Sequence, residues 1–318
     1  MIKKIGILTS GGDAPGMNAA VCGAIRAGHK LGKEMYVVIG GYYGLIHNDI
    51  HKVEANFADH ALNLGGTIIK TKRLPEFKEE NVRKEAVKAL KAEGIDALIV
   101  VGGDGSYMGA KALTSMGINC VGLPGTIDND IASSDYTIGF DTALNTVVEA
   151  IDKIRETADS HKRCIITEVM GNRCPDLTLY AGIATNADYI ITVDKPLDKE
   201  DLIKTLNEKY ETQDSAMVLL AEKQYNLEEL TKFVKENTKW DTRNDILGYI
   251  QRGGTPTAME RVNAIRMGTY AVELLDKGIG GVCVGIVNNK ITHREIFEAL
   301  SLERDKHEDL MQVFEYIK

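Results

Sequence analysis

Short apolar runs recur along this 318-residue chain, and several of them end at a glycine. Most are separated by amphipathic stretches of helical character, such as residues 20–31, 78–92 and 142–158. Continuous apolar strands that alternate with amphipathic helices are typical of a parallel sheet with both faces covered. The pattern predicts an α/β fold with mainly parallel sheets covered by helices, its strands lying at residues 5–8, 36–39, 97–101, 121–123, 165–167, 189–193, 217–220 and 282–287.

The length of the chain predicts more than one lobe, because 318 residues are many for a single core. Residues 138–142, Ile-Gly-Phe-Asp-Thr, begin a long predicted helix and are the expected crossing into the second lobe. The strand–helix alternation continues beyond that point. We therefore expect two Rossmann-like lobes.

The overall charge limits the classes of partner. The formal net charge is −8, which argues against nucleic acid as the main partner and against an anionic membrane surface. No apolar run approaches the roughly 20 residues that a membrane-spanning helix needs. The first residues run into a strand rather than a signal peptide, and the five scattered cysteines form no Cys-x-x-Cys pair. We expect a cytoplasmic protein with reduced thiols.

Three Gly-rich segments follow predicted strands, at residues 11–16, 102–105 and 122–125. We expect them to form turns at the carboxyl ends of parallel strands, where α/β proteins bind ligands. Residues 9–18 also open a helix, and their glycines would let the backbone approach a phosphate at the helix N-terminus. A tight strand-to-helix turn without a ligand explains that segment equally well.

Two segments that carry carboxylates limit the reactions that this site could catalyse. Asp104, in Gly102–Ser106, suits either a Mg²⁺ ion that bridges phosphates or the cap of a helix N-terminus. Residues 124–130, Pro-Gly-Thr-Ile-Asp-Asn-Asp, add Asp128 and Asp130. Phosphoryl transfer needs backbone N–H groups for phosphate oxygens, a carboxylate for a metal and a carboxylate to orient the attacking hydroxyl.

From Lys3 to about Asn289, these collinear motifs resemble the bacterial-type ATP-dependent 6-phosphofructokinases. The resemblance implies the phosphofructokinase fold, with an ATP-binding lobe at 1–139 plus about 252–303. A sugar-phosphate-binding lobe would lie at about 140–251 plus 304–318. It also implies phosphorylation of D-fructose 6-phosphate at the 1-hydroxyl in glycolysis, with Mg²⁺ as cofactor and ATP as co-substrate. The expected assembly is a homotetramer with shared sites.

The same resemblance implies roles for single residues. Asp128 would be the base that accepts the proton of the sugar 1-hydroxyl, Thr126 would hold the transferring phosphoryl group, and Asp130 would support the site. Asp104 would contact Mg²⁺, and Arg73 would neutralise charge that develops on the phosphates. The ATP-binding positions would be Gly12, Arg73, Leu74, Gly103, Asp104, Gly105 and Ser106.

Two glycines bear on the choice of phosphoryl donor. Pyrophosphate-dependent relatives carry bulkier residues where this chain has Gly105 and Gly125. Two glycines would leave room for the α-phosphate of a nucleotide, so the resemblance favours ATP.

A sugar phosphate calls for arginines, because a guanidinium group pairs with two phosphate oxygens at once. In the family, the arginines that match Arg163 and Arg243 reach in from a neighbouring subunit, which implies an obligate oligomer. Glu222 matches the acid that hydrogen-bonds the sugar. The expected substrate contacts are Thr126, Ile127, Asp128, Arg163, Met170, Gly171, Asn172, Arg173, Glu222, Arg243, Tyr249 and Arg252.

Two of these positions depart from the family pattern. Asn172 stands where the family has an arginine that stabilises charge on the transferring phosphoryl group, and Arg173 follows one place later. Either Arg173 takes over that role through a shifted backbone, or the enzyme is slow or differently tuned. Tyr249 replaces a histidine, keeping a hydrogen-bond donor but losing the option of positive charge. A kinase for a related sugar phosphate, or a non-catalytic or regulatory subunit, stays open as an alternative, although the retained carboxylates favour an active enzyme.

The effector site that the resemblance implies is degenerate. Arg26 and Arg155 remain, whereas Cys22 and Ala55 replace arginines and residues 211–214 replace a lysine-rich segment. A phosphate-rich effector would meet neutral and acidic groups there. We expect little regulation by ADP or phosphoenolpyruvate.

Overall fold

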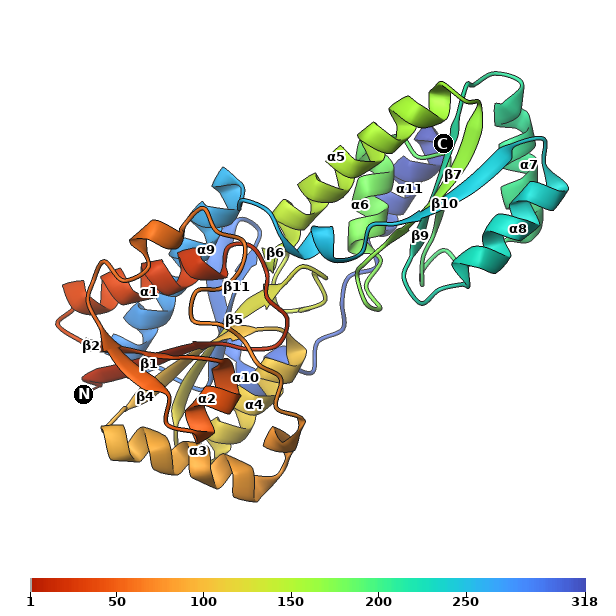
Figure 1. Ribbon diagram of the computed structural model, residues 1–318. Helices are drawn as coiled ribbons and strands as arrows, with labels where there is room; N and C mark the ends of the chain where they lie inside the picture. The colour runs from red at the N-terminus through yellow and green to blue at the C-terminus, as the bar shows by residue number, and fades with distance from the viewer. Residues whose placement is uncertain (1) are drawn as a thin grey trace. The chain divides into compact units, whose positions relative to one another are not determined.

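The computed structural model describes residues 2–318, and the chain divides into two compact units (Figure 1). Unit 1 is formed by Met1–Thr142 and Arg252–Arg304, and unit 2 by Ala143–Gln251 and Asp305–Lys318. Each unit has its own sheet and its own hydrophobic core. The chain therefore leaves unit 1 near the start of helix α5 (Phe140–Asp159), returns to it at Arg252, and ends in unit 2.

The sheet of unit 1 has the strand order β12-β11-β5-β4-β1-β2-β3, and β6 also pairs with β5. The inner strands run parallel, whereas each edge strand is antiparallel to its neighbour. The strands are β1 Lys4–Thr9, β2 Glu34–Val38, β3 Ile50–Val53, β4 Ala97–Gly102, β5 Asn119–Thr126, β6 Ile138–Gly139, β11 Val282–Val287 and β12 Lys290–Glu295.

Burial explains which of these strands the apolar pattern predicted. Both faces of the sheet are covered, so inner strands consist of continuous apolar runs, and all six residues of β4 are buried. The edge strands β3 and β12 carry exposed polar side chains such as His51, Lys52 and Arg294. An edge strand needs no continuous apolar run, so the sequence pattern missed both of them.

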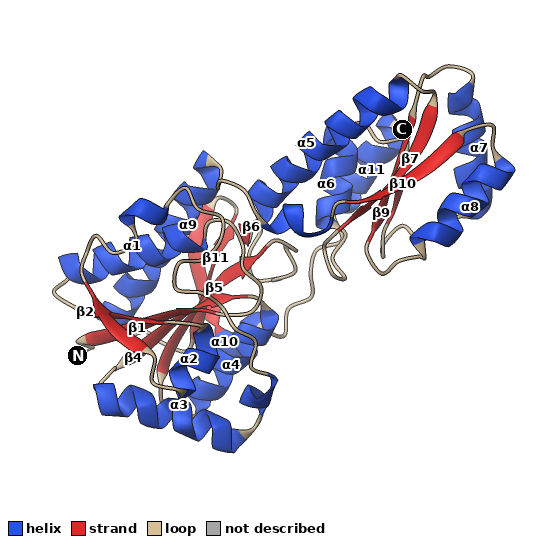
Figure 2. Ribbon diagram, viewed as in Figure 1, coloured by secondary structure: helices blue, strands red, loops and turns tan. Residues whose placement is uncertain are grey.

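Helices cover both faces of this sheet (Figure 2). Helices α1 (Met17–Lys30) and α9 (Ala258–Asp276) pack against each other on one face. The other face forms a second part of the core with α2 Gly41–Ile46, α3 Glu80–Glu93, α4 Asp104–Ser115 and α10 Ile296–Ala299.

Glycines set the close approach of α1 and α9. A methyl group at Gly23 would lie 2.5 Å from the carbonyl oxygen of Ile265, and one at Gly268 would lie 2.2 Å from that of Ala20. Neither distance is possible for a real side chain. The two helix backbones therefore touch only because each presents hydrogen at these points.

The sheet of unit 2 is parallel throughout, with the order β10-β7-β9-β8. Helices α7 (Lys199–Tyr210) and α8 (Leu227–Asn237) pack on one face around the buried Trp240, whose indole donates to the carbonyl of Leu206 at 2.8 Å. Helices α5, α6 and α11 lie on the other face (Figure 2). The remaining elements are β7 Arg163–Val169, β8 Tyr189–Ile191, β9 Ala216–Ala221, β10 Asp241–Ile246, α6 Asp176–Ala184 and α11 Glu308–Ile317.

One predicted Gly-rich turn is part of a strand. Residues 122–125 lie inside β5 rather than after it. A methyl group at Gly122 would come within 2.9 Å of the Tyr107 ring, and one at Gly125 within 2.8 Å of the Met17 methyl carbon. Side chains from α4 and α1 thus fill the space over this strand, and close packing explains its glycines.

Among the described residues, no helix has both the length and the apolar character that crossing a membrane requires.

Candidate active site

Three loops of unit 1 meet at the carboxyl ends of β1, β4 and β5. In the parallel register Thr9 lies opposite Val101, and Gly102 lies opposite Pro124. The backbone N–H of Ser10 donates to the carbonyl of Val101 at 2.9 Å. Because neighbouring parallel strands end at the same edge, the loops that carry Gly12, Asp104 and Asp128 share one side of the sheet.

The loop after β1 is held from two directions. The Thr71 hydroxyl donates to the carbonyl of Gly11 at 2.8 Å. A methyl group at Gly11, whose φ is +88°, would lie 3.4 Å from Ser106 Oγ. A methyl group at Gly12 would lie 3.8 Å from the guanidinium carbon of Arg252. Arg252, expected among the sugar-phosphate contacts, therefore belongs to unit 1 and lies beside the Gly12 loop.

Asp104 is the first residue of α4, and it does not cap the helix. The N-cap position is Gly103, which has no side chain, so the capping interpretation of Asp104 is wrong. The Asp104 side chain is exposed, yet partial burial still raises the pKa of its carboxyl group above the ordinary value. A methyl group at Gly105 would meet no atom within 4 Å, so the space over the first turn of α4 is open.

The turn after β5 carries Asp128 and Asp130, both partly buried. The backbone N–H of Asp128 donates to Thr126 Oγ1 at 3.2 Å. Asn129 is buried in the left-handed conformation, with φ of +54°, and its Oδ1 accepts from the backbone N–H of Thr137 at 2.9 Å. The chain fixes the turn through Asn129, a residue that sequence reasoning did not single out although asparagine is common in this conformation.

Arg73 and Leu74 lie just before the short helix η2 (Pro75–Lys78). Leu74 packs against the core of unit 1, whereas the Arg73 side chain is exposed. The segment is tied to the loop after β1 through Thr71 and through a hydrogen bond from Thr9 Oγ1 to the carbonyl of Lys70 at 2.9 Å. Arg73 therefore lies two residues after Thr71, whose hydrogen bond ties this segment to Gly11.

The side chain of Ile127, which was expected to contact substrate, is buried.

A buried carboxyl group that the sequence did not indicate lies next to the end of the loop between β1 and α1. Glu260 is in the first turn of α9, and its Oε2 accepts from both the backbone N–H and the hydroxyl of Thr142, each at 3.2 Å. Burial raises the pKa of Glu260 to about 7. A methyl group at Gly16, the N-cap of α1, would lie 2.8 Å from Glu260 Cγ, so Glu260 packs directly against the start of that helix.

In unit 2 the expected substrate contacts form two groups. The first follows the carboxyl ends of β7 and β9. The backbone N–H of Asn172 donates to Glu222 Oε1 at 2.7 Å, and that of Met170 donates to Gln251 Oε1 at 3.0 Å. Gln251 was not predicted, because its contact crosses 81 residues of sequence. The same loop holds Gly171 and Arg173.

Lys223 is a second residue that sequence reasoning missed. Its ammonium group donates to Asn172 Oδ1 at 2.7 Å. It directly follows Glu222 in the turn after β9, and its φ of +67° is uncommon for lysine.

Arg163 and Arg243 form the second group, near the opposite ends of β7 and β10. Asp241 pairs with Arg163 in the register, and its carboxylate binds Arg163 at 3.0 Å and Arg243 at 2.7 Å. The hydrogen bond from Arg163 is the main cause that lowers the pKa of Asp241. Strand β7 separates Arg163 from Met170 by about 23 Å at about 3.3 Å per residue. The structure does not bring these arginines to Glu222 within one chain.

Tyr249 lies in the short helix η3 (Gly248–Arg252), and its side chain is 80% exposed. Its phenol ring therefore reaches the surface, two residues before Gln251.

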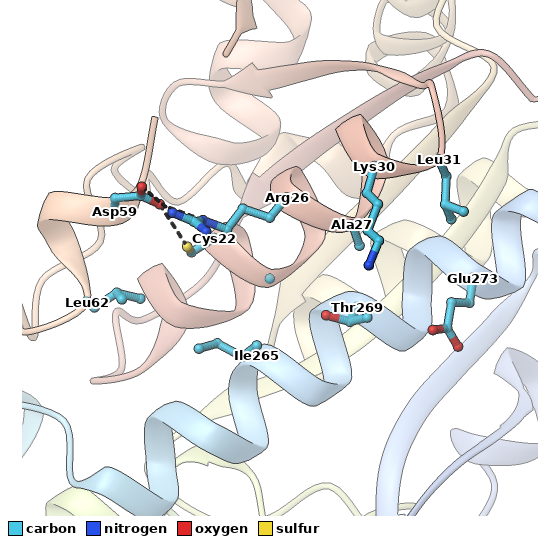
Figure 3. A pocket seen from close by; sticks show the side chains of 11 residues that line it. Cys22, Arg26, Ala27, Lys30, Leu31, Asp59, Leu62, Ile265, Thr269 and Glu273 are labelled. Atoms are coloured by element: carbon cyan, nitrogen blue, oxygen red, sulfur yellow. Dashed lines mark hydrogen bonds and ion pairs between the residues drawn. The ribbon is translucent and has the colours of Figure 1, made fainter. Parts of the chain in front are cut away.

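The two arginines of the expected effector site already have protein partners. Arg26 lines a cavity of about 730 Å³ bordered by α1 and α9 (Figure 3). It forms an ion pair with Asp59, donating from Nε at 2.8 Å, and the thiol of Cys22 donates to the same carboxylate at 3.5 Å. In unit 2, Arg155 donates to the carbonyl of Thr185 at 2.7 Å.

Comparison with known proteins agrees with this arrangement. A family model described as Phosphofructokinase matches residues 4–275. An ATP-dependent 6-phosphofructokinase of Photobacterium profundum is 52% identical over 315 residues, which are 98% of each chain. One of Spiroplasma citri is 50% identical over 319 residues and covers 100% of this chain and 98% of its own length.

Among solved structures, phosphofructokinase from Saccharomyces cerevisiae matches with a TM-score of 0.91 and 32% identity over 98% of this chain. This chain spans 50% of that yeast chain. The match of the family model and the near full-length relatives lead to one conclusion: the chain belongs to the phosphofructokinase family.

Proposed function

We propose that this protein transfers the γ-phosphoryl group of ATP to the 1-hydroxyl of D-fructose 6-phosphate, as an enzyme of cytoplasmic glycolysis. The observation that carries the proposal is the single sheet edge of unit 1 where the Gly12 loop, Asp104 and the Asp128 turn meet. Relatives with about half of their residues identical, over nearly the full length, are ATP-dependent 6-phosphofructokinases.

Asp128 is the proposed general base. It accepts the proton of the 1-hydroxyl as that oxygen bonds to the γ-phosphorus and the bond to the ADP oxygen breaks. The hydrogen bond from the backbone N–H of Thr137 to Asn129 Oδ1 supports this role, because it fixes the backbone of the turn that carries Asp128. Thr126 orients the phosphoryl group and Asp130 supports the site.

Asp104 is the residue that would hold Mg²⁺, and its surroundings fit the ion. Partial burial disfavours its charged form and raises its pKa, and a cation would reverse that effect. No cluster of three or more His, Cys, Asp or Glu residues suited to a metal occurs among the described residues. Mg²⁺ needs none, because it commonly takes one or two carboxylates and fills its other positions with water and phosphate oxygens. When bound, the ion supplies charge neutralisation on the phosphates, and Arg73 adds to it.

The preference for ATP is supported by Gly105, because the space over it is open. Gly125 was expected to leave room for the nucleotide as well. In the structure, a side chain at that position would instead collide with Met17 and Val101 inside unit 1. The argument for ATP therefore depends on Gly105 and on the names of the relatives.

We propose a homotetramer whose sugar-phosphate sites are shared between subunits. Glu222 and Asn172 lie after the carboxyl ends of the strands, whereas Arg163 and Arg243 lie near the other end of the same sheet, roughly 17–23 Å away at about 3.3 Å per residue. Asp241 binds both arginines there, so one unit 2 does not present them beside Glu222. Arginines supplied by a second subunit remove that difficulty.

Weak regulation by ADP and phosphoenolpyruvate is supported by the pairing of Arg26 with Asp59. A phosphate group would have to compete with this carboxylate for the guanidinium. The cavity beside Arg26 is lined by Glu273 and Asp59 as well as by Lys30, so its acidic groups offset its basic ones.

A panel of phosphorylated ketoses and aldoses, each assayed with ATP and Mg²⁺, tests the proposed function. The highest kcat/KM should belong to fructose 6-phosphate. A higher value with another sugar phosphate would favour the second candidate function, which Asn172 and Tyr249 motivate. Absence of turnover with every sugar, in protein that still binds ATP, would favour a non-catalytic subunit.

A further inference from the structure

Two loops of unit 2 are joined by a reciprocal pair of hydrogen bonds. Asn172 donates its backbone N–H to Glu222 Oε1 at 2.7 Å, and its side-chain oxygen accepts from Lys223 Nζ at 2.7 Å. The loop after β7 and the turn after β9 are thereby held together by one asparagine and two consecutive residues. Glu222 and Asn172 both belong to the expected sugar-phosphate set, and Lys223 does not.

The backbone at this junction is unusual on both sides. Asn172 has φ of +57° and Lys223 has φ of +67°. Asparagine tolerates this left-handed region, but lysine rarely occupies it, because its Cβ crowds the backbone. Strain of this kind is often found at functional sites. A glycine would make the same turn without strain.

The contact leaves the charge of Lys223 intact. Its acceptor is a neutral amide oxygen, and an ammonium group has three donors, of which this bond uses one. In the described part of the chain, Lys223 forms no ion pair with a carboxylate. Its side chain is exposed, so the charge is accessible to a ligand. No hydrogen bond or ion pair among the described residues joins Arg173 to Asn172 or Glu222.

We propose that Lys223 is a substrate-contacting residue of the sugar-phosphate site, where its ammonium group supplies the positive charge that Asn172 lacks. This inference rests on the proposed function. Phosphoryl transfer between two anionic substrates requires cations at the reacting groups, and Asn172 orients Lys223 for that contact. The cation is thus Lys223, rather than Arg173 acting through a shifted backbone.

Two substitutions separate this role from a purely structural one. Lys223→Gln removes the charge and keeps a polar side chain, so kcat/KM for fructose 6-phosphate should fall by about 10- to 1,000-fold, with KM for ATP within about threefold of the wild type. Lys223→Arg should retain most of the activity. Lys223→Gly removes the charge and also the backbone strain. It should therefore lose a similar factor in kcat/KM while its Tm stays unchanged or rises.

Lys162 provides a matched control. It is a second exposed lysine of unit 2 in the left-handed conformation, with φ of +51°, and although it directly precedes Arg163, its ammonium group lies over the Tyr210 ring. Lys162→Gly should leave kcat/KM for fructose 6-phosphate within about threefold of the wild type. Arg173→Gln should cost less than Lys223→Gln.

The outcomes are distinguishable. Wild-type turnover combined with near-normal kcat/KM in both Lys223→Gln and Lys223→Gly would overturn the inference and leave the proposed function standing. A large loss in Arg173→Gln with none in Lys223→Gln would assign the charge to Arg173 instead. A wild-type protein that does not phosphorylate fructose 6-phosphate would overturn the proposed function and this inference together.

Discussion

At the scale of single residues, the turn after β5 separates the groups that hold the backbone from the group expected to react. Asn129 Oδ1 accepts from the backbone N–H of Thr137, and the backbone N–H of Asp128 donates to Thr126 Oγ1. Asparagine at position 128 has nearly the size of aspartate and keeps a side-chain oxygen, so Asp128→Asn should preserve the turn. This allows a clean test of its chemistry.

We expect Asp128→Ala and the nearly isosteric Asp128→Asn to lower kcat by about 10²–10⁴-fold, because a general base contributes a factor of that size. ATP binding, measured by calorimetry, and Tm should both stay close to the wild type. Turnover within a few fold of the wild type in the Asn variant would contradict the assignment of the base.

Glu260 gives a prediction for pH. Burial raises its pKa from 4.5 to about 7, and the nearby Asp141 adds to the rise. The folded protein therefore holds this proton more tightly than the unfolded chain does. Its stabilising effect is complete below about pH 4.5 and is lost as pH rises through 7, by about 3 kcal/mol at about 1.4 kcal/mol per pH unit.

The measurement compares the wild type with Glu260→Gln, which does not titrate. The difference in free energy of unfolding, wild type minus variant, should fall as the pH is raised from 5 to 8. Other titrating groups cancel in this difference. A difference that stays constant across that range would show that the Glu260 carboxyl group titrates normally in the fold.

The residues that the sequence revealed and those that it missed differ in the range of their contacts. Asp104 and Asp128 were visible because each stands in a compact motif after an apolar run. Gln251, Lys223 and Glu260 were not, because their partners lie 81, 51 and 118 residues away along the chain. Contacts across such separations leave no local pattern, so only the fold reveals them.

At the scale of elements, the apolar pattern predicted the buried strands. It did not predict the strands whose side chains are largely exposed. The polar edge strands β3, β10 and β12 carry no continuous apolar run. The prediction of a turn at residues 122–125 was also wrong. Glycines usually indicate turns, but here they permit Tyr107 and Met17 to pack onto β5. The sequence alone does not distinguish a glycine that is needed for a turn from a glycine that is needed for close packing.

The contact between α1 and α9 provides a test of such a packing glycine. Gly268→Ala would gain up to about 1 kcal/mol in helix propensity. The added methyl group, however, would lie 2.2 Å from a backbone oxygen of α1, which cannot rotate away. Overpacking typically costs about 1–3 kcal/mol and should outweigh the gain. We expect a net loss of stability, measured by denaturant unfolding.

Gly66→Ala is the control for this substitution, because a methyl group there would meet no atom within 4 Å. Its free energy of unfolding should stay within about 0.5 kcal/mol of the wild type. Equal stability of the two alanine variants would mean that α1 and α9 can move apart without cost.

At the scale of the whole molecule, the separation of Arg163 from Glu222 predicts complementation between subunits. Arg163→Ala and Asp128→Ala should each be nearly inactive as pure proteins. Mixed and allowed to exchange subunits, they should recover part of the wild-type activity, because some sites then receive both intact residues. The same two proteins mixed after cross-linking within each oligomer serve as the control and should stay inactive.

If each chain completed its own site, exchange would restore nothing. Full specific activity in a fraction shown to be monomeric by light scattering would likewise contradict a shared site.

The pairing of Arg26 with Asp59 predicts a weak response to effectors. Each lost charge-assisted hydrogen bond to a phosphate removes about 1.5–3 kcal/mol, which is comparable with a typical allosteric coupling of about 1–3 kcal/mol. The fructose 6-phosphate saturation curve at saturating ATP should therefore barely move when phosphoenolpyruvate or ADP is added. A reversible shift of its midpoint by tenfold or more would show a working effector site.

The division of unit 1 into two stretches of chain has a consequence for the ribosome. Helix α1 ends at Lys30 and its partner α9 begins at Ala258, so 227 residues must be added between them. At about 5–20 residues per second, that takes roughly ten to fifty seconds. Most of unit 2 is one continuous stretch, 143–251, and can collapse during this time. During this interval the face of α1 that contacts α9 and the edge of β5 that pairs with β11 stay uncovered, so the nascent chain exposes surface that is prone to association.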